Sequence, residues 1–417
     1  MLRISSLRFV FYSPEKSVVT QVRELSVSPS TDLSDLVLAL PEGNYKLVVI
    51  ANPTTKLVAR TAVGSPLSQL TGYEHYYTDE LATQGSRLTV SLLNEQGPVT
   101  VTSAAFSSTT PQVRIQLESV LARVLVYGEP RLAGGAKRGS APAGYVLSPQ
   151  ARYTAPLRPL GLLRTGGSEV AGDGSHPEDR YPTSRMCQEW KDSAPRSLTE
   201  LLSHFALDRM TSHEGGEDIY LARLLPDEQA LATAVSNIHV YARETTLPPT
   251  AYLVGALPSL IIRFPYIPGG LTLRENEGWV SFRGKYYTEG QMKEWIRSDD
   301  FDDSTLAEAV KVARINEDSF TAPFEKGDLR FYYRGYNYYV VPIRHFDDTK
   351  APTKTSIGRY GVVRGAEYRI RLTQILRPGT PVPPDLTADL TPVAEEKNVH
   401  AIVSVRPIVV HSSEIHI

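Results

Sequence analysis

Cysteine is almost absent from the sequence, which has Cys187 alone among 417 residues. A single thiol excludes a disulfide within the chain and any zinc site built from several cysteines. Neither sign of charge dominates, because 44 basic and 46 acidic residues leave a formal net charge of -2. The sequence therefore lacks both the polycationic surface typical of nucleic-acid-binding proteins and an acidic tail.

Long hydrophobic runs are also missing. No stretch approaches the ~20 apolar residues of a membrane-spanning helix. The first residues, MLRI, have neither the apolar core nor the cleavage site of a signal peptide. Two expectations follow from these absences: a cytoplasmic protein, or a processed form of a longer one.

Signatures of catalysis are absent as well. The sequence has no Gly-x-Ser-x-Gly elbow, and residues 278–285 miss the spacing of a phosphate-binding loop by one residue. His204 and His213 are too far apart for a pair of metal ligands on one helix face. We therefore predict no enzyme activity, no cofactor and no metal centre.

One acidic cluster has two interpretations. Asp299, Asp300, Asp302 and Asp303 surround Phe301, and a calcium site needs several convergent oxygens. The cluster lacks the glycine and the distal glutamate of a helix-loop-helix calcium site. The favoured interpretation is the exposed start of a helix, where acidic side chains complement the helix dipole.

What the sequence does have is β-strand pattern, most clearly in residues 329–376. Aromatic and β-branched residues dominate 329–345, and we expect a hairpin there with its turn at Gly335-Tyr336-Asn337. Residues 367–374 show a two-residue alternation of side chains, which is typical of a strand with one dry face and one wet face. The tyrosines of residues 332–339 suit a core strand, or alternatively a platform for stacking sugars.

Strands recur along both halves of the chain with short turn-rich connections. Residues 4–12 and 18–25 predict an opening hairpin, and residues 45–53 predict a strand buried on both faces. Two short surface helices are expected, at 290–297 and 304–315. The pattern favours an all-β protein with a few short helices, arranged as two tandem β-sandwich domains, residues 1–160 and residues 161–417.

The C-terminal tail, about residues 393–417, follows a proline-rich spacer and ends on a hydrophobic β-forming segment. It is either an ordinary edge strand of its own sheet or a strand donated to the sheet of a neighbouring subunit. The residues alone leave both open. One face of the segment carries Val403, Val405, Pro407 and Val409, and the other register carries Ile402, Ile408 and Val410.

Several segments form a recognisable series along nearly the whole chain: 43–52 (GNYKLVVIAN), 121–124 (LARV), 241–244 (YARE), 338–345 (YYVVPIRH), 360–370 (YGVVRGAEYRI), 375–379 and 401–407. In this order they resemble the Bacteroidales fimbrillins, the type V pilins. Gly365 and Ile408 depart from the family pattern, which has Asn and Trp there, and Thr245 replaces the Asn that follows Glu244.

This resemblance implies two transthyretin-like sandwiches and a subunit of a cell-surface fimbria that supports adhesion and biofilm formation. Family members are exported as lipoproteins, and an Arg-specific protease then removes their N-terminal strand. The vacated groove accepts the C-terminal strand of the next subunit. The chain starting at the Ile4 strand would then be a matured or trimmed form, exported through the outer membrane to an extracellular fimbrium.

Two functions remain in competition. In the first, the partners are other copies of the chain and related fimbrial subunits, with outer-membrane association through the lipid anchor of the precursor. In the second, the protein is a tip or accessory adhesin that binds a glycan or a host protein. Neither function involves nucleic acid.

Overall fold

The fold is described from a computed structural model. It describes residues 4–28, 31, 33, 35–72, 74–84, 88–95, 97–107, 112–148, 150–157, 193, 196–197, 199–200, 203, 205–206, 221–235, 237–345, 360–384, 399–407 and 412–416.

The first sheet begins with the hairpin that the sequence predicts. β1 (Ser6–Tyr12) pairs antiparallel with β2 (Val19–Ser26), and its other side pairs with β4 (Tyr45–Ala51). Nearly every residue of β4 is buried, as expected for a strand covered on both faces. The order is β2-β1-β4-β8-β10-β30-β3, with β9 paired to β4. The other strands are β3 (Asp35–Val37), β8 (Leu92–Asn94), β9 (Val99–Val101), β10 (Gln112–Ser119) and β30 (Ser412–His416).

Strand pairing passes from this first sheet to a second group of sheets at Val120. β10 pairs with β8 as far as Ser119, and β11 (Leu121–Tyr127) then pairs with β19 (Tyr241–Arg243) and β28 (Ala366–Ile375). The change comes well before the boundary expected near residue 160. β14 (Gly144–Ser148), which precedes that expected boundary, pairs with β21 (Ser259–Ile267) in the second group.

Two facing sheets form the second sandwich. One has the order β12-β28-β11-β19, where β12 is Arg131–Leu132, and β29 (Val399–Pro407) pairs with β28. The other has the order β13-β21-β14-β18, where β13 is Lys137–Arg138 and β18 is Ala222–Arg223, and β26 (Tyr336–Pro342) pairs with β21. The hydroxyl of Tyr145 in β14 donates to the carbonyl of Val124 in β11 at 2.9 Å, which ties the sheets together. The buried residues shared between the sheets include Val124, Val126, Ile370, Leu147, Leu260 and Ile262.

A small lobe with its own core is inserted between β21 and β26. Residues 268–335 form the sheet β23-β22-β25-β24 and the helices α7 (Glu289–Ser298) and α8 (Ser304–Val312), which match the two expected surface helices. Its core is made of Val280, Phe282, Met292, Leu306, Val310, Ile315, Phe320, Leu329 and Phe331. The strands are β22 (Trp279–Phe282), β23 (Lys285–Thr288), β24 (Phe324–Lys326) and β25 (Leu329–Tyr332).

The lobe overturns the hairpin expected around residues 335–337. β25 pairs with β22 and β24 inside the lobe, whereas β26 pairs with β21 in the sandwich. A 3-10 turn separates the two strands, and Arg334 and Gly335 have φ of 53° and 71° there. The chain leaves one sheet and enters another at this turn, so its neighbouring strands never meet as a pair.

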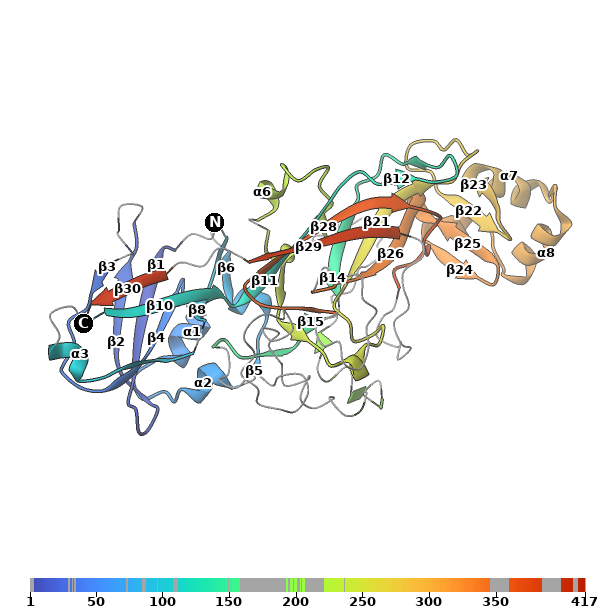
Figure 1. Cartoon of the computed structure of the whole chain (residues 1–417). Coiled ribbons are helices and arrows are strands. Elements are labelled where there is room, and N and C mark those ends of the chain that lie inside the picture. The colour runs from blue at the N-terminus through green and yellow to red at the C-terminus, as the bar shows by residue number, and fades with distance from the viewer. Residues whose placement is uncertain are drawn as a thin grey trace.

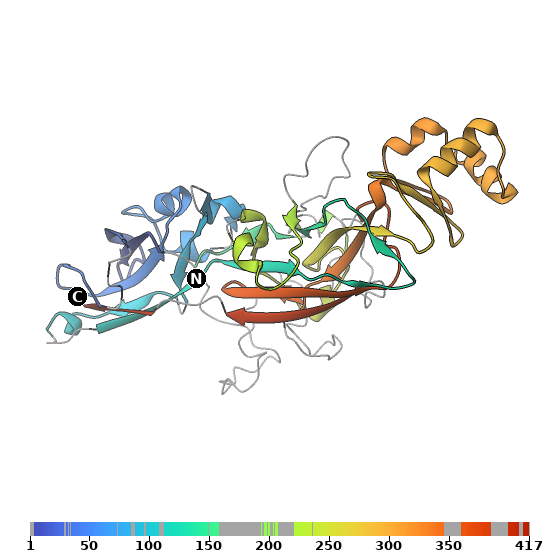
Figure 2. The ribbon, with the colours of Figure 1, turned by 90° about the horizontal axis from the view of Figure 1, so that it is seen from above.

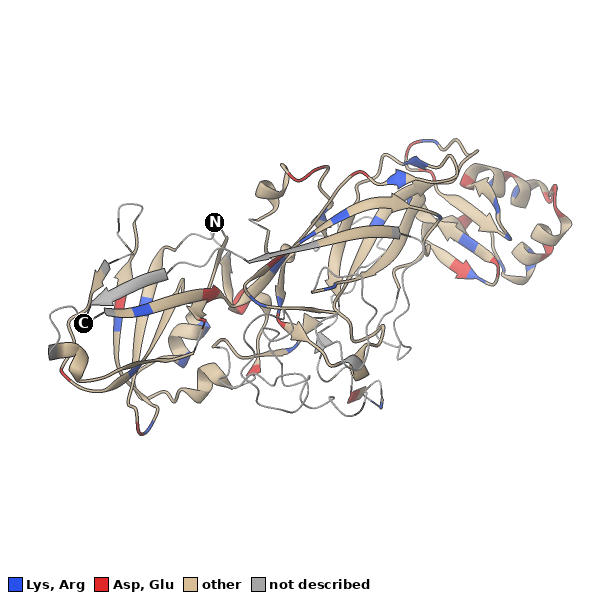
Figure 3. Ribbon diagram, in the orientation of Figure 1, with Lys and Arg blue, Asp and Glu red and all other residues tan. Residues whose placement is uncertain are grey.

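The molecule is elongated, with the first sheet at one end, the helical lobe at the other and the second sandwich between them (Figures 1 and 2). The all-β fold with a few short helices is confirmed. Basic and acidic residues are interspersed along the described ribbon (Figure 3).

The remaining helices and strands named here are α1 (Thr55–Arg60), α2 (Ser68–Thr71), α3 (Ala104–Ser107), α6 (Leu231–Ala234), β5 (Glu74–His75), β6 (Ala82–Gln84), β7 (Leu88–Val90), β15 (Gln150–Ala151), β16 (Tyr153–Thr154), β17 (Phe205–Ala206), β20 (Thr245–Thr246) and β27 (Gly361–Val362).

Candidate strand-exchange site

The last strand of the chain lies inside the first sheet, whereas β29 belongs to the second sandwich (Figure 1). β30 pairs antiparallel with β10, from Gln112 opposite His416 to Gln116 opposite Ser412. Its other side pairs parallel with β3, where Leu36 stands opposite Ile415. A segment from the far end of the sequence therefore completes the sheet built by the first residues.

Apolar and polar positions alternate along the neighbours of β30. Val113 and Ile115 in β10 and Leu36 in β3 are buried, whereas Arg114 is exposed. Cross-strand partners share one face of a sheet, and the backbone register sets Ile415 opposite Val113 and Leu36. The sequence indicates an apolar tail but not this location, because the pairing partners in β10 and β3 lie far earlier in the chain, as Gln112 opposite His416 and Leu36 opposite Ile415 show.

The predicted donor residues lie mainly in β29, which pairs along the whole of β28. Val403 is 9% exposed and belongs to the core, whereas Ile402 is 55% exposed. Val405 and Pro407 stand opposite Tyr368 and Ala366 in the same ladder. In this chain the segment is thus an edge strand of its own sandwich, and its role as a donor stays a prediction. Ile408, Val409 and Val410 lie outside the described residues.

Two segments cross from one group of sheets to the other. β10 continues into β11 through Val120, and the tail passes from β29 to β30 in the opposite direction. β5 adds a third connection, because Glu74 and His75 pair with Thr154 and Tyr153 of β16. The site is therefore placed next to the joint between the two halves of the molecule.

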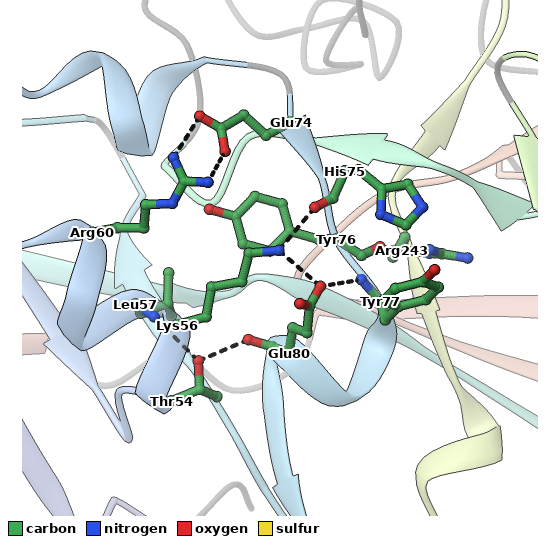
Figure 4. Close-up of polar contacts among 10 residues, drawn as sticks. All are labelled: Thr54, Lys56, Leu57, Arg60, Glu74, His75, Tyr76, Tyr77, Glu80 and Arg243. Atoms are coloured by element: carbon green, nitrogen blue, oxygen red, sulfur yellow. Dashed lines mark hydrogen bonds and ion pairs between the residues drawn. The ribbon is translucent and has the colours of Figure 1, made fainter.

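A polar cluster at this joint holds the segment that follows β5 (Figure 4). Lys56 donates from Nζ to Oε2 of Glu80 and to the carbonyl of His75, each at 2.9 Å, and its ammonium lies 4.1 Å from the ring centroid of Tyr76. Burial works to raise the pKa of the Glu80 carboxyl, yet Lys56 and the Tyr77 N–H hold this pKa below its usual value. The side chain of Tyr76 is fully buried, and burial raises its pKa to about 12.

Further contacts extend this cluster to the second sandwich. Arg60 of α1 forms a two-pronged ion pair with Glu74 of β5. Arg243 of β19 donates from Nη1 to the carbonyl of Tyr76 at 2.6 Å. The residues of Figure 4 thus act as a structural joint between the halves of the molecule, and their geometry offers no nucleophile or acid–base pair for chemistry.

Three of the motif segments that are scattered along the sequence meet in one sheet. Residues 121–124 lie in β11, residues 241–243 form β19 and residues 366–370 lie in β28, and β11 is paired with both β19 and β28. Arg123 donates from Nε to Oε2 of Glu367 at 2.7 Å across this ladder. Residues far apart in the sequence are therefore neighbours in this sheet.

Arg364 and Glu244 form a buried ion pair within this group. Arg364 Nε lies 2.8 Å from Glu244 Oε2, and its Nη1 donates to the carbonyl of Pro156 at 2.9 Å. Both side chains are less than a tenth exposed. The following Gly365 has φ of 69°, a conformation that glycine and asparagine both adopt readily, so the departure from the family's Asn keeps the same backbone.

Tyr368 fastens His345 beside this pair. Its hydroxyl lies 2.8 Å from His345 Nδ1 and accepts a hydrogen bond from the Val363 N–H at 2.8 Å. Burial lowers the pKa of His345 to about 4, and the nearby Glu244 carboxylate only partly offsets that effect. His345 is therefore neutral at pH 7, and its contact with Tyr368 stabilises the fold.

The tyrosine segment proves to be largely core. Tyr332, Tyr338 and Tyr339 are each at most 3% exposed, and the Tyr332 ring stacks on Trp279 with centroids 3.7 Å apart. Tyr336 is partly buried beneath the guanidinium of Arg263, 4.4 Å from its ring centroid. A sugar platform built from these strand residues has no support in this arrangement.

The acidic cluster begins a helix, as the favoured interpretation predicts. Asp303 caps α8 by accepting hydrogen bonds from the N–H groups of Thr305 and Leu306, at 3.0 and 3.3 Å. Its other oxygen pairs with Lys285 at 2.8 Å. The hydrogen bond from Lys285 and those from Thr305 lower the pKa of Asp303.

Within the part of the chain that the structure describes, no group of three or more His, Cys, Asp or Glu residues could hold a metal ion. In the same part, no helix is long and apolar enough to cross a membrane.

Comparison with known proteins gives one family match. Residues 330–414 match the family described as "Major fimbrial subunit protein type IV, Fimbrillin, C-terminal". No curated protein matches the sequence.

Among solved structures, the chain is similar to a proposed cell adhesion protein from Parabacteroides distasonis, with 12% identity, a TM-score of 0.43 and coverage of 97% of this chain and 94% of that one. It is similar to a fimbrilin from Porphyromonas gingivalis, with 13% identity, a TM-score of 0.42 and coverage of 97% and 91%. A third, a proposed cell adhesion protein from Bacteroides eggerthii, has 12% identity, a TM-score of 0.39 and coverage of 99% and 90%. The family match over residues 330–414 confirms the resemblance to the Bacteroidales fimbrillins that the sequence motifs indicate.

Proposed function

We propose that the protein is a structural subunit of a cell-surface fimbria and that it polymerises by strand exchange. In the polymer, the C-terminal strand of one subunit completes the first sheet of the next. Its partners are other copies of itself and related fimbrial subunits, and the assembled fibre supports adhesion and biofilm formation. The precursor reaches the surface through the outer membrane by way of its lipid anchor.

The position of β30 is the observation that carries this proposal. The first sheet accepts residues 412–416 between β10 and β3, so it has a slot that fits this strand in register. Exchange of an identical element between copies of a chain is a low-cost route to assembly, because every contact is preserved. The connection from β29 comes from the other half of the molecule, so the strand reaches a neighbour when that connection extends outward.

The proposed donor therefore has two parts with different roles. Residues 412–416 supply the strand that enters a sheet. β29, with its buried Val403, holds the tail on its own sandwich by pairing with β28. Val405, Pro407 and the segment 408–410 then serve as the connection, or they enter the neighbour together with β30. Both versions belong to the same exchange mechanism.

Cross-linking between chains tests the proposal directly. Arg114 and Glu414 are cross-strand partners, and opposed strand positions have the Cα separation that a disulfide requires. One chain carries Arg114→Cys and the other Glu414→Cys, both on a Cys187→Ser background, and the two are mixed under assembly conditions. We expect a disulfide-linked dimer within filaments. Pairing Arg114→Cys with Ser404→Cys, which lies in β29, is the control and should not cross-link.

A monomeric mixture without cross-linked dimers, or filaments in which the disulfide never forms, would contradict exchange of this strand. Electron microscopy of the same samples shows whether filaments are present.

The inserted lobe supports a second candidate, a tip or accessory adhesin. Residues 268–335 have a separate core and lie at the end of the molecule opposite the first sheet (Figure 2). A glycan array with the wild-type chain and a chain whose lobe is replaced by a short turn distinguishes the candidates. Sugar binding that disappears with the lobe, in a variant still folded by circular dichroism, would favour the adhesin.

A further inference from the structure

Well-exposed aromatic side chains are rare in the part of the chain that the structure describes. Among its well-exposed large apolar side chains, only Tyr77, at 57%, and Tyr153, at 42%, are aromatic. Both contact the same residue, because the ring centroid of His75 lies 4.5 Å from that of Tyr77 and 6.2 Å from that of Tyr153. We call these three residues the aromatic patch. Contiguous exposed apolar surface of this kind commonly marks a binding site.

The backbone that carries the aromatic patch is firmly held. Lys56 donates to the carbonyl of His75 at 2.9 Å, and the Tyr77 N–H donates to Glu80 Oε2 at 2.7 Å (Figure 4). Tyr76, between the two exposed rings, is fully buried. Rigid tyrosine side chains on a fixed backbone lose little further entropy when a ligand binds, which is the advantage of a preorganised binding surface.

The third ring of the patch is fixed by strand pairing. Tyr153 of β16 stands opposite His75 of β5 in an antiparallel pair. The patch therefore combines residues from both sides of the joint between the two halves of the molecule, and its rings come together only in the folded chain.

The chemistry of the patch suits a neutral sugar. Tyrosine offers an apolar ring face and a polar hydroxyl, and histidine offers ring nitrogens that donate or accept hydrogen bonds. A pyranose ring likewise has an apolar C–H face and a rim of hydroxyls. Stacking on a tyrosine removes that face from water, while the polar groups bind the rim. The neighbouring cations Lys56 and Arg60 are paired with Glu80 and Glu74, so they give little attraction to an acidic sugar.

We propose that the aromatic patch is a binding site for a neutral glycan, with pyranose rings stacked on Tyr77 and Tyr153. The site depends neither on strand exchange nor on the inserted lobe, because none of its residues belongs to β30 or to residues 268–335.

A glycan array of neutral and acidic oligosaccharides tests the site. It is titrated with the wild-type chain, Tyr77→Ala and Tyr153→Ala. We expect the wild type to bind neutral glycans and each variant to lose at least tenfold in affinity, because a stacking surface is removed. Tyr77→Phe keeps the ring and should retain most of the binding. Val312→Ala is the control, since it removes a side chain that is 72% exposed on α8 in the lobe, and it should bind like the wild type.

The tyrosine variants should remain folded, because both side chains are exposed, and circular dichroism checks this. A wild-type chain that binds no neutral glycan overturns the proposal, as does glycan binding that survives both alanine substitutions. Binding that is lost when the lobe is replaced but kept in the tyrosine variants would also overturn it and would favour the lobe. Filaments are scored separately, so none of these results bears on strand exchange.

A proline-rich peptide is the competing ligand, because such segments also bind aromatic surfaces. The probe is a peptide with the sequence of residues 379–392, GTPVPPDLTADLTP, titrated into the wild type and into Tyr77→Ala. Failure of this peptide to bind is the expected result. Peptide binding that Tyr77→Ala abolishes, without glycan binding by the wild type, would assign the patch to a peptide and overturn the sugar site.

Discussion

Val113 in β10 and Ile415 in β30 stand directly opposite each other in an antiparallel ladder. This register places the last strand of the chain in the sheet formed by its first strands. The tail thereby joins the two halves of the molecule, because β29 belongs to the second sandwich and β30 to the first sheet. Truncations of the tail are consequently expected to separate assembly from folding.

Deletion of residues 412–417 should abolish filaments and leave a folded monomer. Deletion of residues 398–417 should in addition lower stability, because it removes β29 from β28 and takes Val403 out of the core. Loss of a buried valine alone is worth ~1.5–3 kcal/mol. Electron microscopy scores the filaments, and thermal unfolding compares the two truncations. Filaments from the shorter deletion, or equal melting temperatures for both, would contradict this division of roles.

Glu244→Gln should be strongly destabilising. The substitution leaves the guanidinium of Arg364 buried without its countercharge, and removing one partner of a buried pair costs about 3–5 kcal/mol. Urea unfolding of the variant measures the loss. The control is Glu317→Gln, whose partner Arg297 is 67% exposed, and such surface pairs contribute roughly 0–1 kcal/mol. A loss of similar size in both variants would be evidence against the importance of the buried pair.

The free energy of unfolding should decrease as the pH drops below about 6.5, the pKa of a histidine in the unfolded chain. The pKa of His345 is about 4 in the folded chain and about 6.5 when unfolded, so the unfolded chain binds the extra proton between these values. Stability is then complete above pH 6.5 and declines toward pH 4, by on the order of 3 kcal/mol in total.

Urea unfolding at several pH values checks this window. A His345→Gln variant removes the titrating group and should lose most of the slope between pH 6.5 and pH 4, even if its stability at pH 7 is lower. An unchanged slope in the variant would assign the pH dependence to other groups.

Gly379→Ala should destabilise the turn that follows β28. A Cβ at Gly379 would lie 2.2 Å from the carbonyl oxygen of Tyr338, and the turn is also held by the Gly379 N–H, which donates to Asn337 Oδ1 at 3.0 Å. Relief of such overpacking costs about 1–3 kcal/mol. Gly290→Ala in α7 is the matched control, because the nearest atom to a Cβ there is a side-chain oxygen, Glu277 Oε1 at 3.1 Å, and not backbone. Alanine also favours a helix over glycine by ~1 kcal/mol. Differential scanning calorimetry of both variants measures their melting temperatures. A melting temperature of Gly379→Ala equal to that of the wild type would contradict the prediction.

Local pattern accounts for what the sequence predicts correctly. The period of two in residues 367–374, the apolar run of β4 and the opening hairpin depend on side chains a few residues apart, so the strands appear in the sequence itself. The caps of short helices are equally local, as Asp303 at the start of α8 shows. The motifs around Arg123, Glu244 and Arg364 also indicate the family resemblance from the sequence alone, without any knowledge of their contacts.

Tertiary pairing decided the rest. Nothing local in residues 121–127 shows that they leave the sheet of β10 to pair with β28, and nothing in Leu329–Tyr332 shows that this strand belongs to an inserted lobe. The apolar tail fits any sheet with an open edge, so its two alternatives could not be distinguished from its residues. The sequence by itself determined which segments become strands, because that depends on local periodicity. Only the folded chain decided which distant strand each one joins, because hydrogen-bond ladders are made between segments whose separation the local pattern does not record.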